Sequence, residues 1–195
     1  MKVGSMQGVK TQGSNKVAVL VNGVPGSGKS TLARELSNVL GIPLASKDVI
    51  KEALADTIGI RPFEDWLGLY WNKMYGAAAS ETMWSFLRDS PCGMVLESTW
   101  PGDETWKFVQ PGLERAGVDS VFQIWCSVPI ALARSRCEAR FSSRHRIHGP
   151  LIEGDEWSNR WAKAEALPIS ETLVVDTSKP VDIDDILTWI EENHP

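Results

Sequence analysis

The chain has 195 residues, of which 43% are hydrophobic, and its formal net charge is −5. This length and composition are ordinary for one globular domain with a substantial core, and the acidic balance disfavours nucleic acid or an anionic membrane surface as a partner. Three cysteines without metal-ligand spacing favour a reducing cytoplasm over a disulfide framework, and no apolar run approaches the length of a membrane span.

Residues 1–16 are polar, rich in glycine and serine, and contain no apolar run. We therefore expect a flexible N-terminal leader rather than a signal peptide, followed by one domain over residues 17–195. Within that domain, short apolar runs alternate with segments of helical periodicity. The predicted strands are 17–21, 42–45, 94–96, 121–126 and 173–175, and the predicted helices are 31–40, 49–58, 66–87, 106–116, 130–140 and 183–192.

This alternation predicts an α/β fold with three layers, in which a five-stranded parallel sheet is covered by helices on both faces. Ligands of such folds bind beyond the carboxyl ends of the strands. Polar or ionisable residues follow every predicted strand, so we expect the functional residues at this edge of the sheet.

Residues 23–30, with the sequence GVPGSGKS, follow the first predicted strand and precede the first predicted helix. They fit the phosphate-loop pattern G-x-x-x-x-G-K-[ST] in full and in the context that the pattern requires. Glycines let successive N–H groups turn inward around an anion at a helix N-terminus, the lysine reaches the β- and γ-phosphates, and the serine hydroxyl binds Mg²⁺. The predicted ATP-binding residues here are Gly23, Pro25, Gly26, Ser27, Gly28, Lys29, Ser30 and Thr31.

Two acidic residues stand at the ends of later predicted strands. Asp48 follows the second strand, where it can cap the next helix and can also face the phosphate loop to accept a proton from a substrate hydroxyl or to hold Mg²⁺. The two roles are compatible, and pure capping is the alternative to function. Glu97 ends the third strand and is either an exposed strand-end carboxylate or a partner of Mg²⁺ and substrate. Together with Ser30, these two carboxylates form the predicted metal site.

A cluster of arginines lies near the end of the predicted helix 130–140, and Arg136, Arg140 and Arg144 share one face if that helix continues. Residues 141–161 are rich in arginine, histidine and glycine, which suits a lid over the site. Guanidinium groups there would stabilise charge on a transferring phosphoryl group, and a closed lid would exclude water. The alternative is a solvated helix face whose arginines pair with Glu138 and other acids.

Nine tryptophans are unusual for this length, and several fall between the second and fourth predicted strands. Trp66, Trp71 and Trp100 are candidates for an acceptor pocket that also contains Asp48 and Glu97, because large aromatic side chains suit a flat or apolar substrate. The alternative is packing in the core, which we favour for Trp84, Trp125 and Trp189.

The ordered motifs GVPGSGKST, SKDVIKEAL, VLESTW, WCSVPIALARSRCEAR and VVDTS resemble the P-loop small-molecule kinases. The resemblance is greatest to the group that includes chloramphenicol phosphotransferase and the zeta-toxin-like kinases. It implies that Asp48 is the base on the acceptor hydroxyl and that Lys29 and Ser30 bind the phosphates and the metal. It also implies that Arg136 and Arg140 correspond to the family's arginines at the end of the helix after the fourth strand and that Asp176 and Thr177 lie near the adenine.

From these residues we predict an ATP- and Mg²⁺-dependent phosphotransferase that acts on a hydroxyl of a small molecule, either a metabolite or an antibiotic. The catalytic residues of this prediction are Asp48, Lys29, Arg136 and Arg140. One alternative is a zeta-toxin-like kinase of a nucleotide sugar, and another is a regulatory ATPase that acts through a protein partner. A GTPase switch is disfavoured, because Asn72 and Lys73 continue without the aspartate that specifies guanine.

Overall fold

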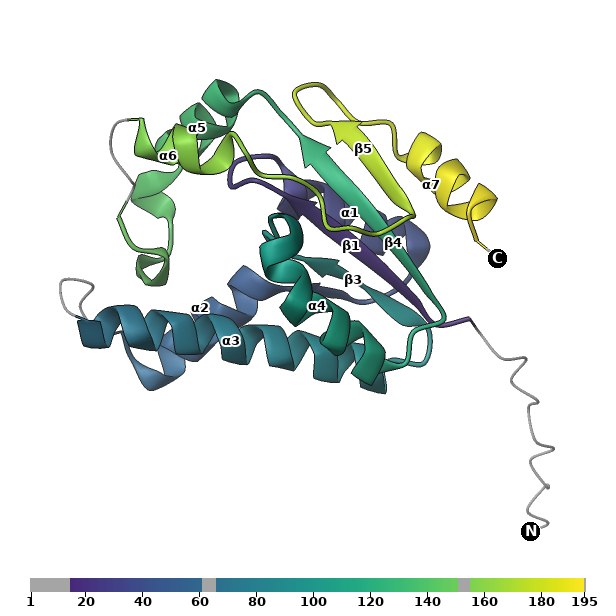
Figure 1. The fold of residues 1–195 in the computed structure, drawn as a ribbon, viewed down its shortest axis with the longest axis horizontal. Helices are drawn as coiled ribbons and strands as arrows, with labels where there is room; N and C mark the ends of the chain where they lie inside the picture. Colours follow the sequence, from purple (N-terminus) through teal and green to yellow (C-terminus); the bar gives the residue numbers. More distant parts are fainter. Residues whose placement is uncertain (1–14, 61–65, 151–154, 195) are drawn as a thin grey trace, which may run out of the picture.

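The computed structural model describes residues 15–60, 66–150 and 155–194 (Figure 1). These residues form one five-stranded sheet in the order β2-β3-β1-β4-β5, and every neighbouring pair of strands is parallel. The fold class predicted from the sequence is therefore confirmed. The strands are β1 (Val17–Gly23), β2 (Leu44–Ser46), β3 (Gly93–Glu97), β4 (Ser120–Ser127) and β5 (Thr172–Asp176).

The helices connect the strands and cover both faces of the sheet (Figure 1). Two short 3₁₀ turns, η1 (Phe141–Ser143) and η2 (Arg146–His148), follow the fifth helix. The helices are α1 (Lys29–Leu40), α2 (Lys47–Ile58), α3 (Trp66–Asp89), α4 (Gly102–Ala116), α5 (Ile130–Ala139), α6 (Glu156–Trp161) and α7 (Ile183–Glu192). None of the helices in the described ranges is both long and apolar enough to cross a membrane.

The apolar residues of β1 divide between two cores, because successive side chains of a strand point to opposite faces. Ala18 and Leu20 pack against α3 and α4, whereas Val19 and Val21 pack against α1 and α7. All four side chains are at most 1% exposed. A strand that is buried on both faces reads as a continuous apolar run, which is the pattern that the sequence shows for residues 17–21.

The elements differ from their predicted bounds mainly at their ends. The strand β1 continues to Gly23, and α2 begins at Lys47, directly after β2. The predicted helix 130–140 corresponds to α5, which ends at Ala139 before η1, so the condition under which Arg136, Arg140 and Arg144 would share one helix face is not met. The predicted leader falls almost entirely on residues 1–14, and the lid includes residues 151–154; both ranges lie outside the described residues.

The parallel register brings the carboxyl ends of the strands together at one edge of the sheet. Glu97, the last residue of β3, is aligned with Val21 of β1 and with Ser46 of β2. On the other side, Gly23 of β1 is aligned with Cys126 of β4, next to the pairing of Ser127 with Asp176. This edge therefore collects residues that lie far apart in the sequence.

Candidate active site

The loop between β1 and α1 has the backbone of a phosphate loop. Gly23, Gly26 and Gly28 have φ angles of 147°, 84° and 86°, which side-chain-bearing residues rarely adopt. At Gly26 a Cβ atom would also lie 2.2 Å from the carbonyl oxygen of Ala133 in α5, so the close approach of loop and helix requires glycine. The loop ends at the N-terminus of α1, where unpaired N–H groups favour an anion.

Lys29 lies across the mouth of this loop, where its ammonium donates a hydrogen bond to the carbonyl of Val24 at 2.9 Å. The residue is 7% exposed. Burial lowers the pKa of Lys29, while the negative charges of Glu97 and Asp48 act in the opposite direction. A buried ammonium whose partner is a neutral carbonyl is stabilised further by a phosphate oxygen, because a hydrogen bond to an ionised acceptor is stronger than one to a carbonyl.

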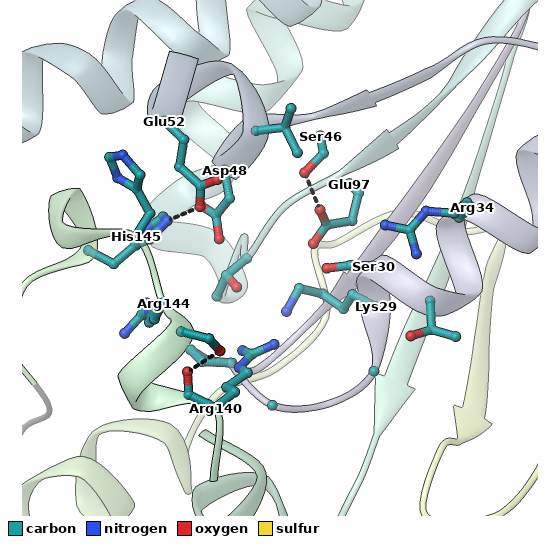
Figure 2. Close-up of a pocket in the computed structure, with 18 of the residues that line it drawn as sticks. Lys29, Ser30, Arg34, Ser46, Asp48, Glu52, Glu97, Arg140, Arg144 and His145 are labelled. Atoms are coloured by element: carbon teal, nitrogen blue, oxygen red, sulfur yellow. Dashed lines mark hydrogen bonds and ion pairs between the residues drawn. The ribbon is translucent and has the colours of Figure 1, made fainter. Parts of the chain in front are cut away.

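A first cavity of about 660 Å³ opens over the phosphate loop (Figure 2). The side chains of Lys29, Asp48 and Glu97 point toward this space, and Arg140 and Arg144 enter it from the lid side. Pro25, Gly26, Gly28, Ser30 and Thr31 also line it, as do Arg34, Leu44, Ser46, Val49, Glu52, Thr99, Ser143, His145 and His148. The tertiary structure thus brings the predicted base, loop lysine and metal ligands into one cavity.

Glu97 is a buried carboxylate rather than an exposed one. The residue is 4% exposed and accepts a hydrogen bond from the hydroxyl of Ser46 at 2.6 Å. The interpretation of Glu97 as a solvated strand-end acid is therefore wrong. Since burying a carboxylate without a counter-charge is unfavourable, its position near Lys29 indicates that it takes part in the charge balance of the cavity.

The oxygen donors in this cavity suit Mg²⁺, which prefers hard oxygen ligands. Ser30, Asp48 and Glu97 all line it. Among the described residues, no group of three or more histidine, cysteine, aspartate or glutamate side chains could hold a metal ion unaided. The residues present therefore fit a Mg²⁺ ion that a nucleotide helps to coordinate, since such ions are held by one or two protein groups together with phosphates.

Asp48 lies where two cavities meet. It lines the first cavity and also a second cavity of about 570 Å³, and Thr99 is the other residue that lines both. Ser46 is the N-cap residue of α2, and Asp48 stands in its first turn. The alternative that Asp48 caps the helix is therefore wrong, and its carboxylate faces the two cavities instead.

Tryptophans form one wall of the second cavity. Trp84 of α3 and Trp100, which follows β3, stack with ring centroids 6.1 Å apart and planes 22° apart. Both are 4% exposed and belong to the core, so the core role predicted for Trp84 is confirmed, although this ring also faces the cavity. The other lining residues are Lys47, Lys51, Asn72, Lys73, Gly76, Ala77, Ser80, Glu81, Thr105, Phe108 and Val109.

The remaining tryptophans lie elsewhere. Trp71 lines neither cavity and packs against Tyr75 in a small apolar cluster between α2, α3 and η2. The side chain of Trp66 lies outside the described residues. Trp189 packs edge-on against Phe122, as predicted for a core residue. Of the two described tryptophans that the sequence proposed for an acceptor pocket, Trp100 lines a cavity next to Asp48 and Trp71 does not.

The arginines near the end of α5 fall into three groups. Arg140 and Arg144 line the first cavity. Arg136 lines neither cavity, and its guanidinium instead donates hydrogen bonds to the carbonyls of Gly26 at 3.4 Å and Thr177 at 3.1 Å. Arg134 pairs with Glu138 at 2.8 Å near the surface, which is the solvated alternative.

The turn after β5 lies beside the phosphate loop. Thr177 is buried, and its N–H and hydroxyl both donate to the carbonyl of Ser127 at 2.9 and 3.0 Å. Asp176 accepts hydrogen bonds from the N–H and the hydroxyl of Ser178, which lower the pKa of its carboxyl group. Neither residue lines the first cavity, so the structure places them behind the loop, where Arg136 connects Thr177 to Gly26.

Residues 145–148, which belong to the predicted lid, contact α2 and α3. His145 contacts the carboxylate of Asp56 at 3.0 Å, and His148 contacts Glu52 at 2.6 Å. The side-chain amide of Asn72 donates to the carbonyl of Ile147 at 2.8 Å. This segment adjoins Arg140 and Arg144, which line the first cavity.

Several site residues were absent from the sequence prediction. Thr99 is shared by both cavities, and Arg144 lines the first one, although the sequence named it only as a member of a cluster. Lys47 and Lys51 line the second cavity. Lys51 lies in the predicted helix 49–58 and Lys47 lies just before it, so their i, i+4 spacing becomes a signal only once the helix is known to begin at Lys47.

A family model described as an AAA domain matches residues 19–162. Among solved structures, the chain is similar to a candidate kinase from Chloroflexus aurantiacus at 25% identity, over 93% of this chain and 100% of that one, with a TM-score of 0.77. It also shares its fold with an APS kinase from Mycobacterium tuberculosis, at 16% identity over 91% and 98% of the two chains, with a TM-score of 0.60. A sugar kinase from Janibacter sp. HTCC2649 is 22% identical over 91% and 95%, with a TM-score of 0.55.

Curated relatives match over a shorter segment. The cytidylate kinase of Pyrobaculum aerophilum is 46% identical over 44 residues, which are 23% of this chain and 24% of that protein. The cytidylate kinase of Pyrobaculum neutrophilum is 50% identical over a segment of the same length. The chain thus spans about a quarter of the length of the curated relatives it matches.

Proposed function

The chain belongs to the AAA domain family and, by its fold, to the P-loop small-molecule kinases, and we propose that it transfers the γ-phosphoryl group of ATP to a hydroxyl of a small molecule. The first cavity binds the triphosphate, and the second cavity binds the acceptor. The single observation that carries this proposal is the position of Asp48, which lines both cavities. A carboxylate between donor and acceptor is where phosphoryl transfer to an alcohol needs a proton acceptor.

In this reaction the acceptor hydroxyl gives its proton to Asp48, and its oxygen forms the new bond to the γ-phosphorus. The bond between that phosphorus and the bridging oxygen breaks, and ADP leaves. Lys29 and the N–H groups of the phosphate loop hold the β- and γ-phosphates, while Arg140 and Arg144 neutralise charge on the transferring group. Ser30 and Glu97 would hold Mg²⁺ with Asp48 beside them, and the ion would supply further neutralisation of the phosphate charge.

Arg136 has a different role from the one that its place in the cluster predicts. Its two hydrogen bonds connect the phosphate loop to the turn at Thr177, so it positions the loop and the nucleotide base rather than touching the γ-phosphate. Asp176 and Thr177 belong to the same base-binding side. Residues 141–150, the described first part of the proposed lid, exclude water that would otherwise hydrolyse ATP.

A nucleotide is the second candidate acceptor, because the segment of strongest identity is shared with cytidylate kinases. In that reaction the attacking oxygen belongs to a phosphate that is already ionised, so it needs no base. A nucleotide sugar remains a hydroxyl acceptor and uses Asp48 in the same way. The three possibilities therefore differ in how strongly turnover depends on Asp48 and in the bond that is formed.

The test compares Asp48→Asn with the matched control Asp103→Asn, which alters an exposed acid in the first turn of α4 that lines neither cavity. ADP release is first measured against a panel of hydroxylated metabolites, antibiotics, nucleotide sugars and nucleoside monophosphates. With the acceptor so found, Asp48→Asn lowers kcat by about 10²- to 10⁴-fold and leaves binding of a non-hydrolysable ATP analogue unchanged. The control keeps wild-type turnover.

Phosphorus NMR of the product identifies the new bond as a phosphate monoester or a phosphoanhydride. A monoester whose formation needs Asp48 supports the proposal. Wild-type turnover in Asp48→Asn would overturn the role of the base, and a phosphoanhydride product would establish the nucleotide acceptor instead. ADP release that no acceptor stimulates would favour a regulatory ATPase.

A further inference from the structure

The helix α2 separates the two cavities and presents a different charge to each. Lys47 and Lys51, four residues apart, line the second cavity, whereas Glu52 lines the first. Asp48 lines both, and together with Glu52 and Asp56 it forms an acidic i, i+4, i+8 row, two members of which hold the lid histidines. Because residues four apart lie on the same side of a helix, the acidic row faces nucleotide and lid while the basic pair faces the acceptor.

The two lysines have little compensation for their charge. Lys51 donates a hydrogen bond to the side-chain oxygen of Asn72 at 2.7 Å, which is a neutral partner. Within the described part of the chain, no carboxylate forms an ion pair with Lys47 or Lys51. Burial lowers the pKa of both ammonium groups, and the charge of Asp48 only partly opposes this effect. Both groups therefore gain from an anion that enters the cavity.

The other charges of the second cavity add to this asymmetry. Lys73 contributes a third ammonium. Among the described residues that line this cavity, Glu81 is the only acid besides Asp48, and its carboxylate is bound by Arg115 at 2.7 Å. Arg115 thus neutralises the charge of Glu81. The ammonium groups of Lys47, Lys51 and Lys73 can therefore bind an anionic ligand.

The opposite wall is apolar and flat. Trp100 stacks on Trp84, and Val109 and Phe108 of α4 extend the same surface. Phe108 is 67% exposed, so the wall continues to the mouth of the cavity. Planar rings favour a planar partner, because stacking adds to the burial of apolar area.

We propose that the acceptor is a flat, hydroxyl-bearing small molecule that carries an oxyanion, either a carboxylate or a phosphate. Its ring lies on the wall of Trp100 and Phe108, its oxyanion lies at Lys47 and Lys51, and its hydroxyl reaches Asp48. This inference rests on the proposed function for the identity of the second cavity as the acceptor site. The oxyanion supplies the counter-charge that the lysines lack, and its binding fixes which end of the molecule faces the γ-phosphate.

The inference is tested with two dyes of the same ring system, of which only one is charged. The anionic probe is 8-anilinonaphthalene-1-sulfonate, and the neutral probe is N-phenyl-1-naphthylamine; the binding of each is measured by fluorescence titration. The double substitution Lys47→Gln with Lys51→Gln lowers the affinity for the anionic probe about tenfold or more and leaves the affinity for the neutral probe unchanged. Lys163→Gln with Lys179→Gln removes the same charge outside the cavity and changes neither affinity.

Ala77→Trp fills the second cavity from α3 and weakens both probes, which locates the binding there. Benzoate and phenyl phosphate are then used to displace the anionic probe from the wild-type chain. Displacement by either one supports the inference, and the stronger competitor identifies the kind of oxyanion. If neither displaces the probe, or if the double lysine variant weakens both dyes equally, the inference is overturned.

These titrations involve no phosphoryl transfer. A negative result would overturn the proposal that the acceptor carries an oxyanion, but it would not affect the proposal that Asp48 is the base for transfer to a hydroxyl. Conversely, full turnover in Asp48→Asn would overturn the role of Asp48 as the base, but it would not affect the preference of the second cavity for an anionic probe. Circular dichroism of each variant establishes that it is folded before either result is read.

Discussion

The side-chain amide of Asn22 forms hydrogen bonds with both the N–H and the carbonyl of Trp100. Its Oδ1 accepts the N–H of Trp100 at 2.9 Å, and its Nδ2 donates to the carbonyl of the same residue at 2.8 Å. The same Oδ1 also accepts the N–H of Gly23, the first residue of the phosphate loop, at 2.7 Å. One buried amide thus connects the loop that binds the donor to the wall of the second cavity.

We expect Asn22→Leu to lower both stability and nucleotide affinity. The substitution leaves the N–H groups of Gly23 and Trp100 and the carbonyl of Trp100 without this partner, in a position where Asn22 is fully buried. Each unsatisfied group costs about 1–3 kcal/mol, so for these three groups the free energy of unfolding in urea falls by at least about 3 kcal/mol. Asn193→Ala, which removes an exposed amide bonded to the carbonyl of Trp189, is the control and changes little. Equal losses in the two variants would contradict the role given to Asn22.

A pair of glycine substitutions tests the packing of the tryptophan stack. A Cβ atom on Gly112 would lie 2.5 Å from the indole of Trp84, which is stacked on Trp100 and cannot move freely. Gly112→Ala therefore lowers the free energy of unfolding by about 1–2 kcal/mol, because overpacking outweighs the gain in helix propensity. A Cβ atom on Gly76, which is also helical, meets nothing within 4 Å, so Gly76→Ala raises stability by up to about 1 kcal/mol. Stabilisation by both changes would show that Trp84 is free to shift.

Substitution of the arginines separates the roles that the structure gives them. Arg140→Met removes a charge from the first cavity and lowers kcat by about 10²- to 10³-fold, with little change in the affinity for an ATP analogue. Arg136→Met breaks the link between Gly26 and Thr177 and weakens the ATP analogue about tenfold. Arg134→Met, which removes a surface pair with Glu138, serves as the control. A loss confined to kcat in Arg136→Met would restore the catalytic role that the sequence predicted for it.

The burial of His148 predicts a dependence of stability on pH. Burial lowers the pKa of His148, and the charges of Arg144 and Lys51 act in the same direction, whereas Asp48 and Glu52 oppose them. A histidine that is neutral in the folded chain destabilises it once the unfolded chain takes up a proton, that is, below about pH 6.5. Stability is therefore lost as the pH falls from about 6.5 through the lowered pKa.

His148→Gln keeps a donor for Glu52 but cannot titrate, so it provides the matched comparison. Unfolding in urea is measured for both chains between about pH 5 and pH 8. The wild type loses stability relative to His148→Gln as the pH falls, and the two curves run parallel above neutrality. Parallel curves over the whole range would contradict the lowered pKa of His148.

Local patterns predicted the fold and the donor half of the site. The phosphate loop is continuous in sequence, and the buried strands appear as apolar runs, so β1, the loop and α1 could be recognised before any contact was known. The predicted roles of Asp48, Glu97 and Arg140 remain to be tested, although all three residues line one cavity. Trp71 shows the limit of composition as evidence, because a tryptophan near the site in sequence packs in a separate apolar cluster instead.

The sequence by itself determined the class of fold, the nucleotide-binding loop and the set of charged residues at the strand ends, because each depends on neighbours along the chain. Only the tertiary structure decided that Asp48 joins two cavities, that Arg136 binds the carbonyls of Gly26 and Thr177, and that Asn22 holds Trp100, 78 residues away. The reason is physical. A parallel sheet aligns strands that are distant in sequence, and side-chain hydrogen bonds across it depend on that register rather than on local propensity.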